Sequence, residues 1–144
     1  MTFLRLLRAW LIILPMMIAN GAFRELVLER WVAPMVAETL SVCLGIAIIV
    51  VMTRYLLRPL AGQSATALVR ASVTLVLLTV AFEFLFGHYV DSKSWSELVA
   101  NYAIWEGRLW PVALIALAFM PFLWGRWSLA EPRDVSRWLS SVGL

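Results

Sequence analysis

The sequence predicts an all-α fold, a four-helix bundle integral to a membrane, and two observations predict it: the composition and the length of the apolar segments. Of the 144 residues, 62% are hydrophobic and 15% are charged, whereas a soluble domain averages about 45–50% apolar and about 25% charged residues. A chain of this length forms one core, which cannot shield so many apolar side chains from water. The composition therefore excludes a water-soluble monomer, and most of the surface is expected to face lipid.

Four segments are long and apolar enough to cross a membrane, since about 30 Å of hydrocarbon takes about 20 residues of helix. The expected spans are residues 3–23, 34–55, 67–88 and 109–127. Pro15 predicts a kink in the first span. Pro111 lies in the first turn of the fourth span, where a missing N–H does no harm. No repeat or linker divides the chain, so residues 1–144 are expected to form one domain.

The first span has an alternative interpretation as a secretory signal peptide. Arg5 and Arg8 precede the apolar run, and small residues lie near its end at positions 19–22, an arrangement typical of a cleavable signal. Because the apolar run is long for a signal, we expect the segment to be retained as a span.

The distribution of basic residues predicts the orientation of the bundle. Eight of them lie at the amino terminus, around the second connection and in the tail: Arg5, Arg8, Arg54, Arg58, Arg70, Arg126, Arg133 and Arg137. Four lie in the first and third connections: Arg24, Arg30, Lys93 and Arg108. Lys and Arg are in excess on the cytoplasmic side of a membrane protein. Both termini are therefore expected in the cytoplasm, and tryptophans near both boundaries agree with two aromatic belts.

Two short amphipathic helices are expected at the membrane surface. In the third connection, Ser94 and Glu97 have the spacing of a capping box. The apolar stripe that follows consists of Trp95, Leu98, Val99, Tyr102 and Trp105. A similar stripe, formed by Val135, Trp138, Leu139 and Val142, follows Pro132 in the C-terminal tail. Each helix could lie on the membrane or pack against the bundle itself, since amphipathic periodicity does not identify the partner.

Two carboxylates lie inside the expected spans at similar depth below the outer surface. Glu38 is about one turn into the second span, and Glu83 is about one turn inside the outer end of the third. A carboxylate in hydrocarbon costs about 3 kcal/mol, so each is expected to face the bundle and find a partner. Arg24 and Arg108 are the candidate partners, because a guanidinium can hold a carboxylate with two hydrogen bonds.

Small and hydroxyl-bearing residues lie on the same helix faces as the two carboxylates. The face with Glu83 has Ser72, Val76, Thr79 and Gly87, and the face with Glu38 has Ser41 and Gly45 and runs onward to Met52. Because such stripes let helices approach closely, we expect the second and third spans to meet along them.

Further polar residues are expected to complete a pocket open to the outer side. They are Asn20, Glu25, His88, Tyr89, Asn101, Tyr102 and Glu106. The cluster could be a structural salt-bridge network, or it could be a binding pocket or a proton-carrying carboxylate pair. No metal or other cofactor is expected, because the chain has one Cys and one His and His88 does not share a helix face with Glu83.

Three short motifs resemble patterns in a family of small bacterial membrane proteins. They are NGAFRE at residues 20–25, FEFLFGH at 82–88 and GRLW at 107–110. The resemblance covers nearly the whole chain and implies a protein of the bacterial inner membrane, without implying an activity.

Three functions fit the sequence. The first is a non-enzymatic membrane protein whose outer pocket binds a small ligand, a lipid headgroup or a partner segment. The second is an oligomeric, proton-coupled transporter or channel component that uses Glu83 or Glu38. The third is a membrane enzyme with Glu83 and His88 as acid and base. The expected partners are the lipid bilayer and either further copies of the chain or a larger membrane complex, and no nucleic acid.

Overall fold

The structure is a computed structural model that describes residues 3–127, all of whose regular elements are helices. The long helices are α1 (Phe3–Phe23), α3 (Pro34–Leu56), α4 (Ala65–Tyr89) and α6 (Trp110–Trp127). The short ones are the π-helix η1 (Arg24–Leu28), α2 (Glu29–Trp31), the 3-10 helices η2 (Arg58–Leu60) and η3 (Ile104–Glu106), and α5 (Trp95–Ala100). The all-α prediction is confirmed. The predicted amphipathic helix of the C-terminal tail lies outside the described residues.

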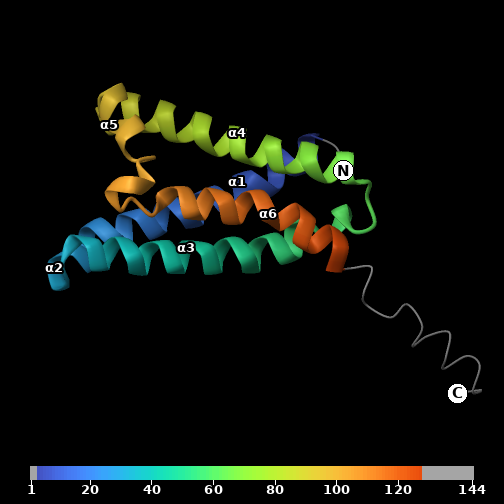
Figure 1. Cartoon of the computed structure of the whole chain (residues 1–144), viewed down its shortest axis with the longest axis horizontal. Coiled ribbons are helices and arrows are strands. Elements are labelled where there is room, and N and C mark those ends of the chain that lie inside the picture. The colour runs from blue at the N-terminus through green and yellow to red at the C-terminus, as the bar shows by residue number, and fades with distance from the viewer. Residues whose placement is uncertain (1–2, 128–144) are drawn as a thin grey trace, which may run out of the picture.

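The four long helices alternate in direction (Figure 1). The chain enters and leaves the bundle at one end, called here the terminal end, whereas α2, α5 and η3 lie at the other, called here the cavity end. Around the bundle the order is α1, α3, α6, α4, with α3 and α4 diagonally opposite. The prediction that the second and third spans meet along their small residues is therefore wrong. Those residues approach the other two helices, since Ser72 Oγ donates to the Ala118 carbonyl of α6 at 2.7 Å and Gly45 lies against Met17 of α1.

The first helix extends further than predicted. Its α-helical part ends at Phe23 as expected, but η1 and α2 continue it without a break to Trp31. Gly21 does not end the helix. The chain becomes extended only at Val32 and Ala33, which has φ −59° and ψ 146°. Pro34 explains this change, because a proline disfavours helical geometry in the residue before it.

Three helices within residues 3–127 have the length and hydropathy of membrane spans: Phe3–Trp31, Pro34–Leu56 and Ala65–Tyr89. The fourth, Trp110–Arg126, is apolar but shorter. Their outward faces carry exposed apolar side chains such as Leu4, Leu77 and Phe119. The described part of the chain is thus a helical bundle with three apolar helices long enough to cross a membrane.

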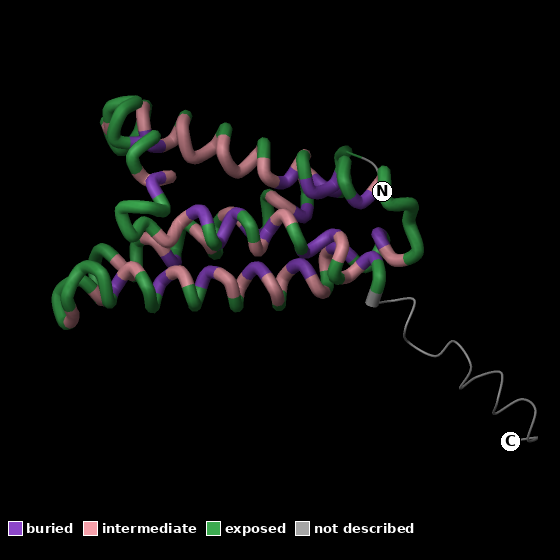
Figure 2. The backbone as a smooth tube through the Cα atoms, viewed as in Figure 1, coloured by how far each residue is buried: buried purple, intermediate pink, exposed green. Residues whose placement is uncertain are grey.

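The tightly packed core lies in the half of the bundle nearest the terminal end (Figure 2). It includes Leu57, Leu60, Leu68 and Leu75, all of them buried. Hydrogen bonds between helices add to this packing, since Trp124 Nε1 donates to Thr53 Oγ1 at 3.0 Å. Toward the cavity end, the residues of α4 become only partly buried (Figure 2). The polar residues of the predicted pocket lie in this more open half.

Candidate functional site

A cavity of about 740 Å³ lies between the four long helices and the chain that connects α4 to α6. Its mouth is polar and its deeper wall is apolar. The mouth carries Arg24, Glu25, Asp91, Lys93, Glu97, Asn101 and Arg108, and the deeper wall includes Trp10, Ile13, Leu14, Met17, Ile49, Phe82, Leu114 and Leu117. Glu38, Glu83, Asn20, Ser41 and Trp110 also line it. The cavity is therefore amphipathic, with a charged opening and an aromatic and aliphatic interior.

Glu83 projects from α4 and is held by two neutral donors. Its Oε2 accepts from the Tyr102 hydroxyl at 2.5 Å and from the Trp110 indole Nε1 at 2.7 Å. Burial raises the pKa of the Tyr102 phenol, and the neighbouring Glu83 raises it further. The phenol therefore keeps its proton and remains a donor to the carboxylate.

Glu38 projects from α3 toward the start of α6. Its Oε1 accepts a hydrogen bond from the Leu109 backbone N–H at 3.1 Å. The first N–H groups of a helix lack partners within the helix, and a negative charge near them is favourable. Glu38 therefore caps α6, while Glu83 binds the next residue, Trp110. The two carboxylates reach consecutive residues, in agreement with the prediction that they lie at similar depth.

The predicted ion pairs between these glutamates and Arg24 or Arg108 are absent from the described structure. Arg24 instead lies 3.0 Å from Glu25 and 3.5 Å from Glu29, measured from guanidinium nitrogen to carboxylate oxygen. The continued helix places these acids beside Arg24, so it has nearer partners than Glu38 or Glu83. Arg108 is exposed at the mouth and makes no ion pair with a described carboxylate.

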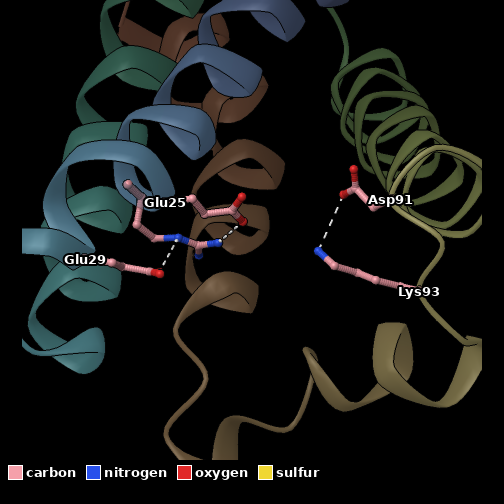
Figure 3. A network of polar contacts seen from close by, with 5 residues as sticks. Glu25, Glu29, Asp91 and Lys93 are labelled. Carbon is pink, nitrogen blue, oxygen red and sulfur yellow. Dashed lines mark hydrogen bonds and ion pairs between the residues drawn. The ribbon is translucent and has the colours of Figure 1, made fainter.

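A second charged pair faces the Arg24 cluster across the mouth. Lys93 Nζ lies 3.5 Å from Asp91 Oδ2 in the turn after α4. Figure 3 shows Glu25 and Glu29 on one side and Asp91 and Lys93 on the other. The predicted capping box at the start of α5 is confirmed, and Glu97, its acidic member, also lines the mouth. Hydrogen bonds from the Ser94 backbone N–H and hydroxyl hold the pKa of Glu97 below its ordinary value, which keeps it ionised.

The structure brings together seven of the eleven residues of the predicted pocket along the cavity: Asn20, Arg24, Glu25, Glu38, Glu83, Asn101 and Arg108. Tyr89 is 72% exposed and does not line it. Tyr102 contributes indirectly, through Glu83. His88 does not line the cavity, because its ring stacks on Trp95 at 4.0 Å and its Nδ1 donates to the Lys93 carbonyl at 2.8 Å. Glu106 is exposed in η3 and does not line it either.

Asn20 has an unmet hydrogen-bonding requirement. The residue is 8% exposed, and its Nδ2 donates to the Ser41 carbonyl of α3 at 2.9 Å. Its Oδ1 is buried without a hydrogen-bond partner among the described residues. A buried acceptor without a partner costs about 1–3 kcal/mol. Since Asn20 lines the cavity, a ligand there can supply the missing donor.

Several lining residues were not among the predicted site residues: Trp10, Trp110, Asp91, Lys93 and Glu97. Trp110 has the position of an interfacial tryptophan in the sequence, but its indole points inward to Glu83. Asp91 and Lys93 lie in a turn that includes Ser92, at φ 57°. In the sequence, Asp91 and Lys93 could have been identified as site residues from the position of this turn, directly after the span that carries Glu83.

No family model, curated protein or solved structure matches this chain. Within residues 3–127, no group of three His, Cys, Asp or Glu side chains could hold a metal ion. The geometry of the cavity is therefore the feature that bears on function.

Proposed function

We propose that this chain is a four-span integral membrane protein of the bacterial inner membrane that binds a small amphiphilic ligand in its cavity. The apolar outer faces of the long helices support membrane insertion, because a soluble bundle presents polar residues there. At about 1.5 Å per residue, the 18 residues of α6 reach about 27 Å, near the thickness of the hydrocarbon.

The orientation proposed for the bundle has the cavity end outside and the terminal end in the cytoplasm. Trp31 and Trp105, which are 83% and 85% exposed, lie at the cavity end. Such exposure suits an aromatic belt at the level of the headgroups. Six described basic residues lie toward the terminal end and four toward the cavity end, and this excess favours the cytoplasmic side for the terminal end. The six are Arg5, Arg8, Arg54, Arg58, Arg70 and Arg126, and the four are Arg24, Arg30, Lys93 and Arg108.

The amphipathic cavity is the observation that carries the proposed binding function. Ligand sites in proteins have volumes of about 300–1,000 Å³, largely apolar walls and a few polar groups that orient the ligand. The cavity has such a volume and such walls, with Glu38, Glu83 and Asn20 as the polar groups. A structural salt-bridge network accounts less well for it, because neither glutamate forms an ion pair with a described base.

A substitution at Gly21 tests whether the cavity binds a ligand. Gly21 lines the cavity, and a Cβ at this position meets no atom within 4 Å. Gly21→Phe should therefore fill the cavity without displacing a helix, and Gly21→Ala is the matched control. The probe is 8-bromooctan-1-ol, whose bromine quenches tryptophan fluorescence on contact, and Trp10 and Trp110 line the wall.

For protein in lipid nanodiscs, we expect a saturable quenching component in the wild type and in Gly21→Ala that Gly21→Phe abolishes. The linear component from lipid-facing tryptophans should persist in all three proteins. Quenching that is linear in the wild type, or identical in all three, would contradict the proposal.

A second candidate function is proton-coupled transport by an oligomer. It is favoured by two cavity-lining carboxylates that form no ion pair with a described base, since such a group can exchange a proton for a cationic substrate. In proteoliposomes, uptake driven by a proton gradient should then be lost in Glu83→Gln or Glu38→Gln. Uptake unaffected by both substitutions would exclude this mechanism.

A further inference from the structure

We propose that the ligand of this cavity is an organic ammonium ion, that is, a primary amine attached to an apolar body. The inference rests on the proposed binding function and specifies the chemistry of the ligand. Three independent features of the wall support it: the inventory of donors and acceptors, the balance of charge and the nature of the apolar surface.

Most of the hydrogen-bond donors of the inner wall are already used within the protein. Trp110 Nε1 and the Tyr102 hydroxyl donate to Glu83, and Trp10 Nε1 donates to Thr79 Oγ1 at 3.0 Å. Asn20 Nδ2 donates to the Ser41 carbonyl. There are two exceptions. The Ser41 hydroxyl can both donate and accept, and Arg24 Nε, nearer the mouth, is buried without a hydrogen bond and lies 3.5 Å from Glu29 Oε1. A ligand that needs many donors from the protein would therefore find few at this depth.

Acceptors remain free at the same depth. Asn20 Oδ1 has no partner, and no hydrogen bond from the described residues reaches Glu83 Oε1 or Glu38 Oε2. The three residues that carry these acceptors come from three different helices and line one cavity. A primary ammonium group has three N–H donors and no acceptor, so it matches what the wall lacks.

The charge of the wall also favours a cation. Among the described lining residues, the acids Glu25, Glu38, Glu83, Asp91 and Glu97 outnumber the bases Arg24, Lys93 and Arg108. Arg24 and Lys93 are already paired with acids at the mouth. An anionic ligand would add to the excess of negative charge, whereas an ammonium ion would offset it.

The volume and the aromatic lining indicate an organic cation and not a bare metal ion. The cavity of about 740 Å³ far exceeds the volume of a single ion, and its deeper wall is apolar. Trp10, Phe82, Phe86 and Trp110 line it, and ring faces attract ammonium groups while their area accommodates an apolar body.

A series of probes with one eight-carbon chain tests this inference on the intact protein in nanodiscs. The probes are octylammonium, octyltrimethylammonium, 1-octanol and octanoate, with affinities from calorimetric titration corrected against empty nanodiscs. We expect octylammonium to bind at least about tenfold more tightly than each of the others, because the trimethyl compound has no N–H and octanoate has the wrong charge.

Glu83→Gln and Glu38→Gln should each weaken octylammonium binding about tenfold and leave 1-octanol unchanged. In Glu83→Gln, the amide oxygen of the new side chain remains an acceptor for Trp110 and Tyr102, so the fold should persist, and thermal unfolding checks that it does. Glu106→Gln, which removes an exposed carboxylate outside the cavity, is the matched control and should bind like the wild type.

The outcomes separate this inference from the proposed function. Binding of 1-octanol or octanoate as tight as that of octylammonium would overturn the ammonium assignment and leave the binding function in place. A preference for octylammonium that survives both glutamine variants would overturn the assignment as well. If none of the four probes binds the wild type, both the ammonium assignment and the proposed binding function are rejected. This result needs the wild-type protein alone.

Discussion

The Glu83 carboxylate of α4 accepts a hydrogen bond from the Trp110 indole at the first residue of α6, with Oε2 and Nε1 2.7 Å apart. One residue earlier, the Leu109 N–H donates to Glu38 of α3. The start of α6 is therefore fixed from both sides by carboxylates on the two diagonal helices. The same two carboxylates line the cavity, so the contacts that position α6 also shape the candidate site.

Trp110→Phe should destabilise the bundle, because it removes a donor from the partly buried Glu83 and leaves most of the ring area in place. Hydrogen bonds to charged groups contribute about 1.5–3 kcal/mol in soluble proteins, and those between membrane helices average less. We expect a loss of about 1–2 kcal/mol in the free energy of unfolding, measured by titration of mixed micelles with a denaturing detergent. Trp105→Phe is the control, since Trp105 is exposed, and a loss as large there would refute the assignment.

Trp10 and Thr79 should be energetically coupled across the cavity. The Trp10 Nε1 of α1 donates to Thr79 Oγ1 of α4, whose own proton goes to the Leu75 carbonyl. In a double-mutant cycle of Trp10→Phe and Thr79→Val, we expect a coupling of about 0.5–1.5 kcal/mol in the free energy of unfolding. Additive effects of the two substitutions would show that this bond does not join α1 to α4.

The capping box of α5 should make this short helix sensitive to acid. Hydrogen bonds from Ser94 hold the pKa of Glu97 below its ordinary value, which is about 4.3 in an unfolded chain. A depressed pKa in the folded state contributes stability that is fully present above the unfolded value and is lost as the pH falls through the folded value. Amide exchange of residues 95–100 should therefore accelerate, relative to its intrinsic pH dependence, as the pH falls below about 4.3.

Ser94→Ala should weaken this effect without removing it, because the variant loses the hydroxyl donor and keeps the backbone N–H. The pKa of Glu97, followed by NMR of its carboxyl carbon, should therefore rise part of the way toward the ordinary value. Glu106→Gln removes another exposed carboxylate of the same connection and should leave both measurements unchanged. A Glu97 pKa that is the same in the wild type and in Ser94→Ala would contradict this explanation.

The sequence predicted those features whose cause is local. The capping box depends on Ser94 and Glu97 three residues apart, and the similar depth of Glu38 and Glu83 depends on helical rise alone. The boundaries of the long helices, apart from the continuation of the first one to Trp31, follow from apolar length and from prolines such as Pro34. Each of these signals lies within a few turns of one helix, so one sequence was enough to find them.

The partners of the carboxylates depend on competition between side chains from different helices. The stripe of small residues around Gly45 indicates that another helix approaches closely. It does not show whether that helix is α1 or α4. Arg24 has the right chemistry for Glu38 or Glu83, yet the continued helix places Glu25 and Glu29 nearer to it. Trp110 could equally serve a lipid headgroup or a buried carboxylate, since its indole N–H suits either. Only the arrangement of the helices in space decides these cases.

Two glycines should respond in opposite ways to alanine, because the space beside them differs. At Gly125 of α6, an added Cβ would lie 2.6 Å from Leu68 Cδ2 and 2.9 Å from Leu68 Cδ1, and Leu68, a residue of α4, is buried in the core. Gly125→Ala should therefore lower the free energy of unfolding by about 1–3 kcal/mol, as overpacking of a core does. At Gly21 of α1 the Cβ meets nothing within 4 Å, so alanine should raise the free energy of unfolding by about 0.5–1 kcal/mol through its higher helix propensity.

Unfolding of both variants in mixed micelles measures the difference. A Gly125→Ala protein as stable as Gly21→Ala would mean that α4 and α6 are not packed as closely as the structure places them.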